Sequence, residues 1–120
     1  NLEDVDNDKN RLVKKKINNE FNKMLVKFQD SHEHITGYNL SKIKDQFDII
    51  QNKISNMPTG KTTNEIASAN ESISENIKKI NILVDQINPE GNLENIEKSI
   101  LSESNLLKEN LKFRQELLKI

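Results

Sequence analysis

The chain has 120 residues, with 18 Lys and Arg against 19 Asp and Glu for a formal net charge of −1, and it contains no cysteine. The near balance of charge argues against a basic nucleic-acid-binding arm, so we expect no nucleic-acid partner. The absence of cysteine excludes disulfides and thiolate metal sites, and without a run of about 18 apolar residues we expect no membrane insertion.

Glycine and proline occur only within three short stretches, at 36–39, 57–60 and 88–92. Helix interiors disfavour both residues, so these stretches are expected to be turns. We therefore predict that the segments between these turns form four helices, near 4–34, 40–57, 63–88 and 92–119. The predicted fold is all-α.

The first two segments each carry one apolar stripe at helical spacing. In the segment 40–57, the apolar residues step by 3, 4, 3, 4 and 3 positions, which is an unbroken heptad pattern. We expect Asn39 or Ser41 to cap this helix. The stripe of 4–34 is Val5, Leu12/Val13, Ile17, Phe21, Met24/Leu25 and Phe28, and that of 40–57 is Leu40, Ile43, Phe47, Ile50, Ile54 and Met57.

The third segment begins with a helix-capping pattern. Thr62 followed by Glu65 has the spacing of a capping box, and Pro89 is expected to end the helix. Its apolar residues lie on one face and include many β-branched side chains, so packing must hold this helix. They are Ile66, Ala69, Ile73, Ile77, Ile80, Val84 and Ile87.

The fourth segment has two apolar stripes side by side. The first is Leu93, Ile96, Ile100, Leu107, Leu111 and Leu118, and the second is Leu106, Phe113, Leu117 and Ile120. Such a wide arc meets two neighbours or a partner chain. We expect the first helix to cover the second stripe; the alternative is that these four residues form a partner-binding surface.

Short connections between helices favour antiparallel packing of consecutive helices. The expected architecture is therefore an antiparallel four-helix bundle, or a section of coiled-coil-like rod, formed by residues 1–120. Because the chain starts at Asn1, we interpret it as one helical domain or a fragment of a larger protein. Its apolar faces also leave self-association open.

Gly60-Lys61-Thr62 resembles the end of a phosphate-binding P-loop. That motif needs a glycine five positions before Gly60, where this chain has Ser55, and it needs a preceding strand rather than a helix. Lys61 and Thr62, near the free N–H groups of a helix start, are therefore at most a weak anion site. We expect no cofactor.

The residues indicate neither a catalytic site nor a metal site. His32 and His34 are two positions apart, so they point in different directions on a helix and do not share a metal. The carboxylates are scattered at surface spacing, and no nucleophile motif is present. We expect a protein that is not an enzyme.

The abundance of Asn, Lys and Ile, together with isoleucine-rich heptads, resembles the helical body of the reticulocyte-binding-like proteins of malaria parasites. Phrases such as 74–81 (SENIKKIN) and 92–100 (NLENIEKSI) carry this resemblance. It implies a segment of an invasion adhesin that presents or supports a surface for a receptor on the host erythrocyte. It also implies an extracellular location, on the parasite surface or in an apical secretory organelle.

Two other functions remain open. One is a structural coiled-coil spacer or assembly module without receptor contact, and the other is a weak nucleotide-binding module at 60–62. A binder is distinguished from a spacer by aromatic or arginine anchors on its surface. The candidates for such anchors are Tyr38, Arg114 and Phe113.

Overall fold

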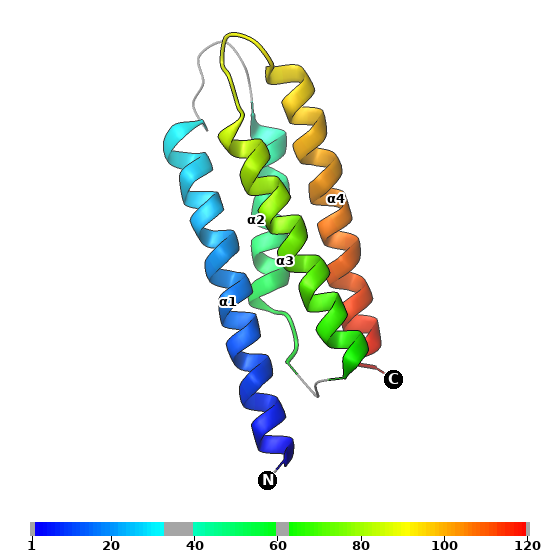
Figure 1. Cartoon of the computed structure of the whole chain (residues 1–120). Coiled ribbons are helices and arrows are strands. Elements are labelled where there is room, and N and C mark those ends of the chain that lie inside the picture. Colours follow the sequence, from blue (N-terminus) through cyan, green and yellow to red (C-terminus); the bar gives the residue numbers. More distant parts are fainter. Residues whose placement is uncertain (1, 33–39, 60–62, 120) are drawn as a thin grey trace.

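The computed structural model describes residues 2–32, 40–59 and 63–119, and for residues 2–8 only the backbone. This part of the chain forms four helices and no strand, which confirms the all-α fold (Figure 1). Every helix end lies within three residues of its predicted position. The helices are α1 (Leu2–Ser31), α2 (Ser41–Ser55), α3 (Asn64–Asp85) and α4 (Leu93–Leu117).

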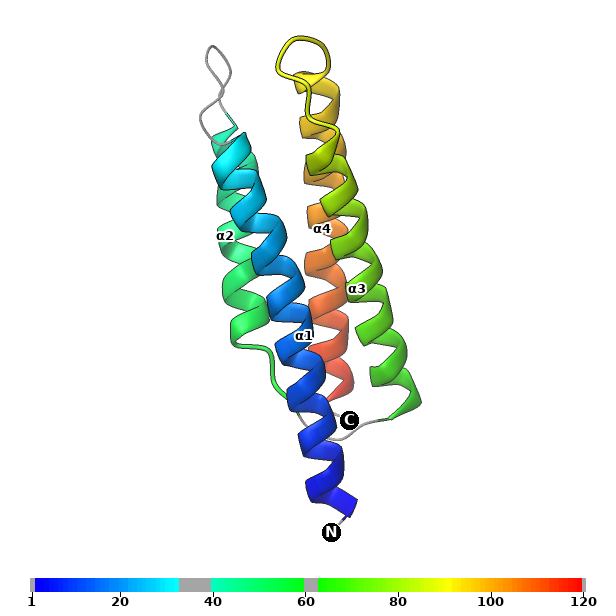
Figure 2. The same ribbon diagram turned by 60° about the vertical axis from the view of Figure 1, so that its left-hand side comes forward.

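Consecutive helices run in opposite directions, as expected for an antiparallel bundle (Figure 1). Around the bundle, however, the order is α1, α2, α4, α3, so that α2 and α3 are diagonal and do not pack on each other (Figure 2). The connection between them, residues 56–63, is long enough for this. Eight residues span up to about 26 Å, whereas helices packed 8–10 Å apart are roughly 13 Å apart across a diagonal.

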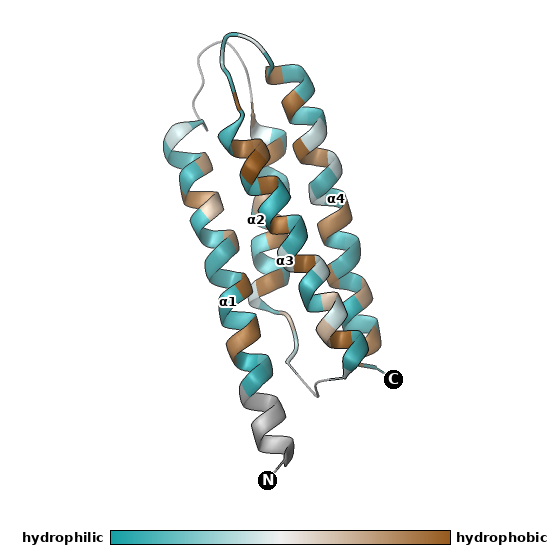
Figure 3. Ribbon diagram, in the orientation of Figure 1, coloured by the Kyte–Doolittle hydropathy of each residue, from teal (hydrophilic) through white to brown (hydrophobic). Residues whose placement is uncertain are grey.

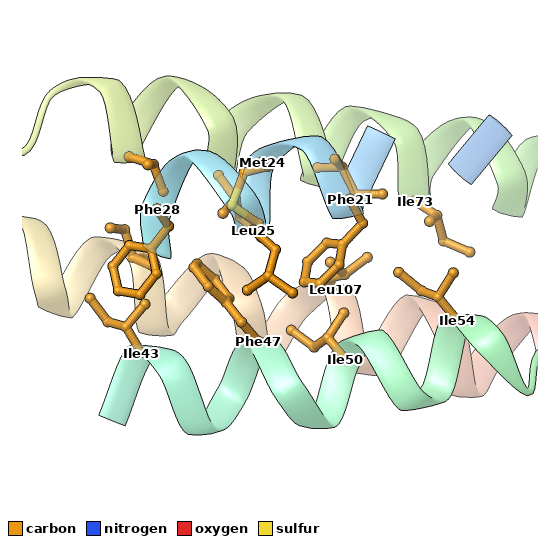
Figure 4. Close-up of a cluster of buried hydrophobic side chains, with 14 of the residues drawn as sticks. Phe21, Met24, Leu25, Phe28, Ile43, Phe47, Ile50, Ile54, Ile73 and Leu107 are labelled. Atoms are coloured by element: carbon orange, nitrogen blue, oxygen red, sulfur yellow. The ribbon is translucent and has the colours of Figure 1, made fainter. Parts of the chain in front are cut away.

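Most residues of the predicted stripes form one core along the bundle, and each helix alternates between hydrophobic and hydrophilic segments (Figure 3). One exception, in the stripe of α1, is Leu12, which is 66% exposed, while its neighbour Val13 packs against the core. All six heptad residues of α2 and all seven stripe residues of α3 are buried. Phe47 lies between two other rings, with centroid distances of 5.9 Å to Phe21 and 5.1 Å to Phe28, both edge to face (Figure 4). Edge-to-face ring pairs stabilise the folded chain beyond what the burial of their apolar surface contributes.

Two helix caps differ from the prediction by one residue. The N-cap of α3 is Thr63 rather than Thr62: Thr63 has an extended backbone, and its Oγ1 accepts a hydrogen bond from the N–H of Ile66 at 3.2 Å. At α2 the N-cap position is Leu40, which makes no side-chain cap bond and is buried instead. Asn39 lies outside the described residues, and Ser41 is already helical.

The turn between α3 and α4 is held by its own asparagines. The N–H of Asn88 donates to Asn92 Oδ1, and Asn92 Nδ2 donates to the carbonyl of Gln86, both at 2.8 Å. These bonds satisfy backbone groups left free at the helix end. α3 ends at Asp85, before the predicted position 88. Asn88 precedes Pro89, and a residue before proline disfavours helical geometry, so helices usually end at or before it.

The bundle is narrow and long, with extents of 56 × 22 × 19 Å. The first turns of α1 continue past the end of the other helices (Figures 1 and 2). α1 begins and α4 ends at the same end of the bundle, as an even number of antiparallel helices requires.

Candidate partner-binding surface

The second apolar stripe of α4 lies at the outside of the bundle. Phe113 is 57% exposed and Leu106 is 43% exposed, whereas Leu117 is half-buried. Ile120 lies outside the described residues. The expectation that the first helix covers this stripe is wrong, because in the described part of the chain α1 packs on α2 and α3 and is diagonal to α4 (Figure 2).

The exposed stripe borders a groove between α3 and α4, called here the α3/α4 groove. It consists of two hollows of about 460 Å³ and about 430 Å³ that share Ser68, Ser72 and Asn110. Phe113 lines the first hollow and Leu106 the second. Small side chains on α3 thus face two large apolar side chains on α4.

The α3 side of this groove is acidic on balance. Glu65 lines one hollow, while Glu71, Glu75 and Lys79 line the other. Glu75 also has an exposed partner on its own helix, Lys78, at 3.6 Å. Exposed pairs of this kind are weak, and with three glutamates against one lysine the lining of the groove has a net negative charge.

A buried amide network fixes the floor of the groove. Asn76, which is 4% exposed, donates from Nδ2 to Glu103 Oε2 at 3.1 Å, and Asn110 Nδ2 donates to Asn76 Oδ1. These bonds hold α3 and α4 in one register and thereby place Leu106 and Phe113 along the groove.

Both asparagines of this network were missed in the sequence. The sequence does indicate that Asn76 is buried. Ile73, Asn76 and Ile80 are separated by three and four residues, so they lie on the same core-facing side of the helix. A buried amide needs a hydrogen-bond partner, so an asparagine at such a position indicates a polar contact with a neighbouring helix.

Arg114 is not a surface anchor but a fully buried side chain. Its Nε donates to Asn70 Oδ1 at 2.7 Å and its Nη1 to the carbonyl of Pro58 at 2.6 Å, so it ties α4 to α3 and to the segment that follows α2. Burial lowers the pKa of this guanidinium from its ordinary value. The burial of Arg114 could have been predicted from the sequence. Leu107, Leu111 and Arg114 are separated by four and three residues, which places Arg114 on the same inward face of the helix. The other proposed anchor, at position 38, lies outside the described residues.

The opposite flank of α4 has the opposite charge. There α2 and α4 border a groove of about 760 Å³, called here the α2/α4 groove, whose lining includes Lys53, Lys108, Lys112 and Glu109. Its most exposed large apolar side chain is Ile49, at 42%. The residues that line it include no aromatic side chain, so it lacks the kind of anchor that dominates protein interfaces.

The remaining predicted positions add no further site. Lys61 and Thr62 lie outside the described residues, as do His34 and Tyr38. Within 2–32, 40–59 and 63–119, no three His, Cys, Asp or Glu side chains are grouped as a metal site would require. No helix in these ranges is apolar over a length that could cross a membrane.

His32 lies at the end of α1, close to charged groups of two helices. Burial lowers the pKa of His32 from its ordinary value of 6.5; Asp85 raises the pKa and Lys27 lowers it by smaller amounts. Lys27 Nζ itself lies 2.6 Å from Asp85 Oδ1. The folded chain therefore favours the neutral imidazole.

This shift predicts a pH dependence of stability. Because the pKa of His32 is lower in the folded chain, the unfolded chain binds the proton more readily, so stability is lost as the pH falls below about 6.5. We expect urea unfolding between about pH 7.5 and pH 5.5 to show a smaller loss of stability for His32→Gln than for the unmodified chain. Equal losses in the two proteins would contradict the assignment to His32.

No protein-family model, curated protein or solved structure matches this chain. The candidate function therefore depends on the geometry of the surface and on the resemblance noted in the sequence.

Proposed function

We propose that this chain is a non-catalytic recognition module of an erythrocyte-invasion adhesin, and that it contacts its partner through the α3/α4 groove. The observation that carries this proposal is the exposure of Phe113 and Leu106 beside one groove. Exposed apolar side chains that border a groove commonly mark protein contacts, and aromatic residues are enriched among those that supply most of the binding energy.

The other exposed apolar side chains are arranged differently. Leu12 and Val26 lie on α1, Ile49 on α2 and Ile82 on α3. Val26 and Ile82 are single exposed residues of a kind that is normal on a protein surface. Leu12 lines a groove of about 730 Å³ between α1 and α3, but the lining of that groove, like that of the α2/α4 groove, includes no aromatic side chain. Leu106 and Phe113 are seven residues apart on one helix, which places them on the same face two turns apart.

The class of partner comes from the resemblance to the reticulocyte-binding-like proteins. It supports a receptor protein on the erythrocyte surface, and a location of this chain on the parasite surface or in an apical organelle from which it is released. The physical features are compatible with such a role, since the bundle has a continuous core and a charged, solvated exterior.

A structural spacer is the second candidate, favoured by the long and narrow shape of the bundle. A spacer needs only a packed core and a solvated exterior. The 57% exposed Phe113 beside the α3/α4 groove favours the recognition module, because aromatic side chains are enriched among interface anchors.

Binding to cells tests the proposal directly. The folded chain is incubated with erythrocytes and with a panel of non-erythroid cells, and bound protein is measured by flow cytometry. We expect saturable binding to erythrocytes. If the folded chain binds no erythrocytes, the recognition module is contradicted and the structural spacer is the remaining candidate. Binding confined to non-erythroid cells would contradict the assignment to invasion adhesins.

A further inference from the structure

The α3/α4 groove has the length and shape of a site for a helix. Along α3 its lining runs from Asn64 to Lys79, which at about 1.5 Å per residue is roughly 22 Å, or four helical turns. The side chains of Ser68, Ala69 and Ser72 are small, so they leave room for another helix to approach α3 closely. Leu106 and Phe113 are two turns apart on α4, so the apolar stripe of an incoming helix can contact both.

The net negative charge of the groove indicates that the polar face of its occupant is basic. Among the residues that line the groove, three glutamates, Glu65, Glu71 and Glu75, stand against one lysine, Lys79. Within the described ranges, Glu65 and Glu71 have no ion-pair partner. On α4, Lys108 and Lys112 line the other groove, toward α2, and so leave this side of the bundle negative on balance.

From this geometry we propose that the partner contributes a basic amphipathic helix of about four turns, which lies in the α3/α4 groove. Its apolar stripe packs on Phe113 and Leu106, and its Lys or Arg side chains face Glu65, Glu71 and Glu75. This inference rests on the proposed function only in taking the groove as the contact surface. Complementary charge of this kind fixes orientation and speeds association.

Two designed helical peptides of equal length and identical apolar stripe test this inference. One carries Lys and the other Glu at the flanking positions, and each is titrated into the isotope-labelled chain while amide chemical shifts are recorded. We expect the Lys peptide to bind at least about tenfold more tightly than the Glu peptide. The shifts should concentrate along α3 and α4 at Ser68, Ser72 and Asn110.

A charge-matched pair of variants separates local from overall charge. Glu65→Lys with Glu71→Lys should weaken binding of the Lys peptide by about tenfold. Glu90→Lys with Glu94→Lys changes the net charge equally at positions outside the groove and should leave binding nearly unchanged. Equal effects of the two pairs, or equal affinity for the two peptides, would overturn the inference.

Other outcomes are equally decisive. Shifts centred on Lys53 and Lys108 would place the peptide in the α2/α4 groove and overturn the inference, as would a second copy of the chain that occupies the α3/α4 groove and excludes the peptide. Binding of the Lys peptide without any erythrocyte binding would contradict only the proposed function. If erythrocyte binding depends on Phe113 but the chain binds the Lys and Glu peptides equally, only the inference of a basic partner helix is contradicted.

Discussion

Replacement of Phe47 by alanine is expected to lower the free energy of unfolding by about 3–5 kcal/mol. Phe47 is fully buried and packs edge to face on both Phe21 and Phe28 (Figure 4). The substitution therefore removes two aromatic contacts and opens a cavity where α1 meets α2. Since a domain of this kind has a total stability of about 5–15 kcal/mol, the loss is a large fraction of it.

Urea unfolding followed by circular dichroism measures this loss. Ile49→Ala is the matched control, since Ile49 lies on the same helix and is 42% exposed, and we expect it to cost less than about 1 kcal/mol. If Phe47→Ala were no more destabilising than Ile49→Ala, the packing of α1 on α2 in this structure would be wrong.

The second large effect is expected at the buried pair of Asn70 and Arg114. Asn70→Leu removes the side-chain acceptor of a fully buried guanidinium and is expected to cost about 3 kcal/mol or more, because the charge stays buried. Arg114→Met removes the charge itself and keeps much of the volume. It leaves only neutral oxygens unpaired, so we expect a smaller cost of about 1–2 kcal/mol.

A double-mutant cycle on these two positions tests the argument. Asn70→Leu combined with Arg114→Met replaces the polar pair with apolar side chains, and we expect the double variant to be less destabilised than Asn70→Leu alone. A larger loss from Arg114→Met than from Asn70→Leu would contradict this account, and would mean that the hydrogen bonds of Arg114 outweigh the cost of burying its charge.

The sequence predicted the helices well because the core stripes of α2 and α3 follow helical spacing without interruption. Every stripe residue of these two helices is buried, and the helices end and begin on either side of the stretches that contain glycine and proline. The order of the helices around the bundle was not predictable in this way. A stripe shows which face of a helix is buried, but it does not identify the neighbour that buries it, so the diagonal placement of α2 and α3 came only from the structure.

The candidate surface was predicted in part. The stripe containing Leu106 and Phe113 was visible in the sequence, but its exposure depends on the diagonal placement of α1 and α4. Arg114 was a candidate surface anchor because arginine is one of the residue types enriched among interface anchors. Its spacing from Leu107 and Leu111 was the better guide, since position on the helix decides burial when a hydrogen-bond partner is available on the neighbouring helix.

The central claim is that the α3/α4 groove is the recognition surface. The most direct measurement compares erythrocyte binding of Phe113→Asp and Val26→Asp, each first shown to be folded by circular dichroism. Phe113 and Val26 are 57% and 52% exposed, and Val26 lies on α1, which is diagonal to α4. We expect Phe113→Asp to lose at least about tenfold in affinity and Val26→Asp to bind like the unmodified chain. Equal binding by both variants, or a loss only in Val26→Asp, would contradict the claim.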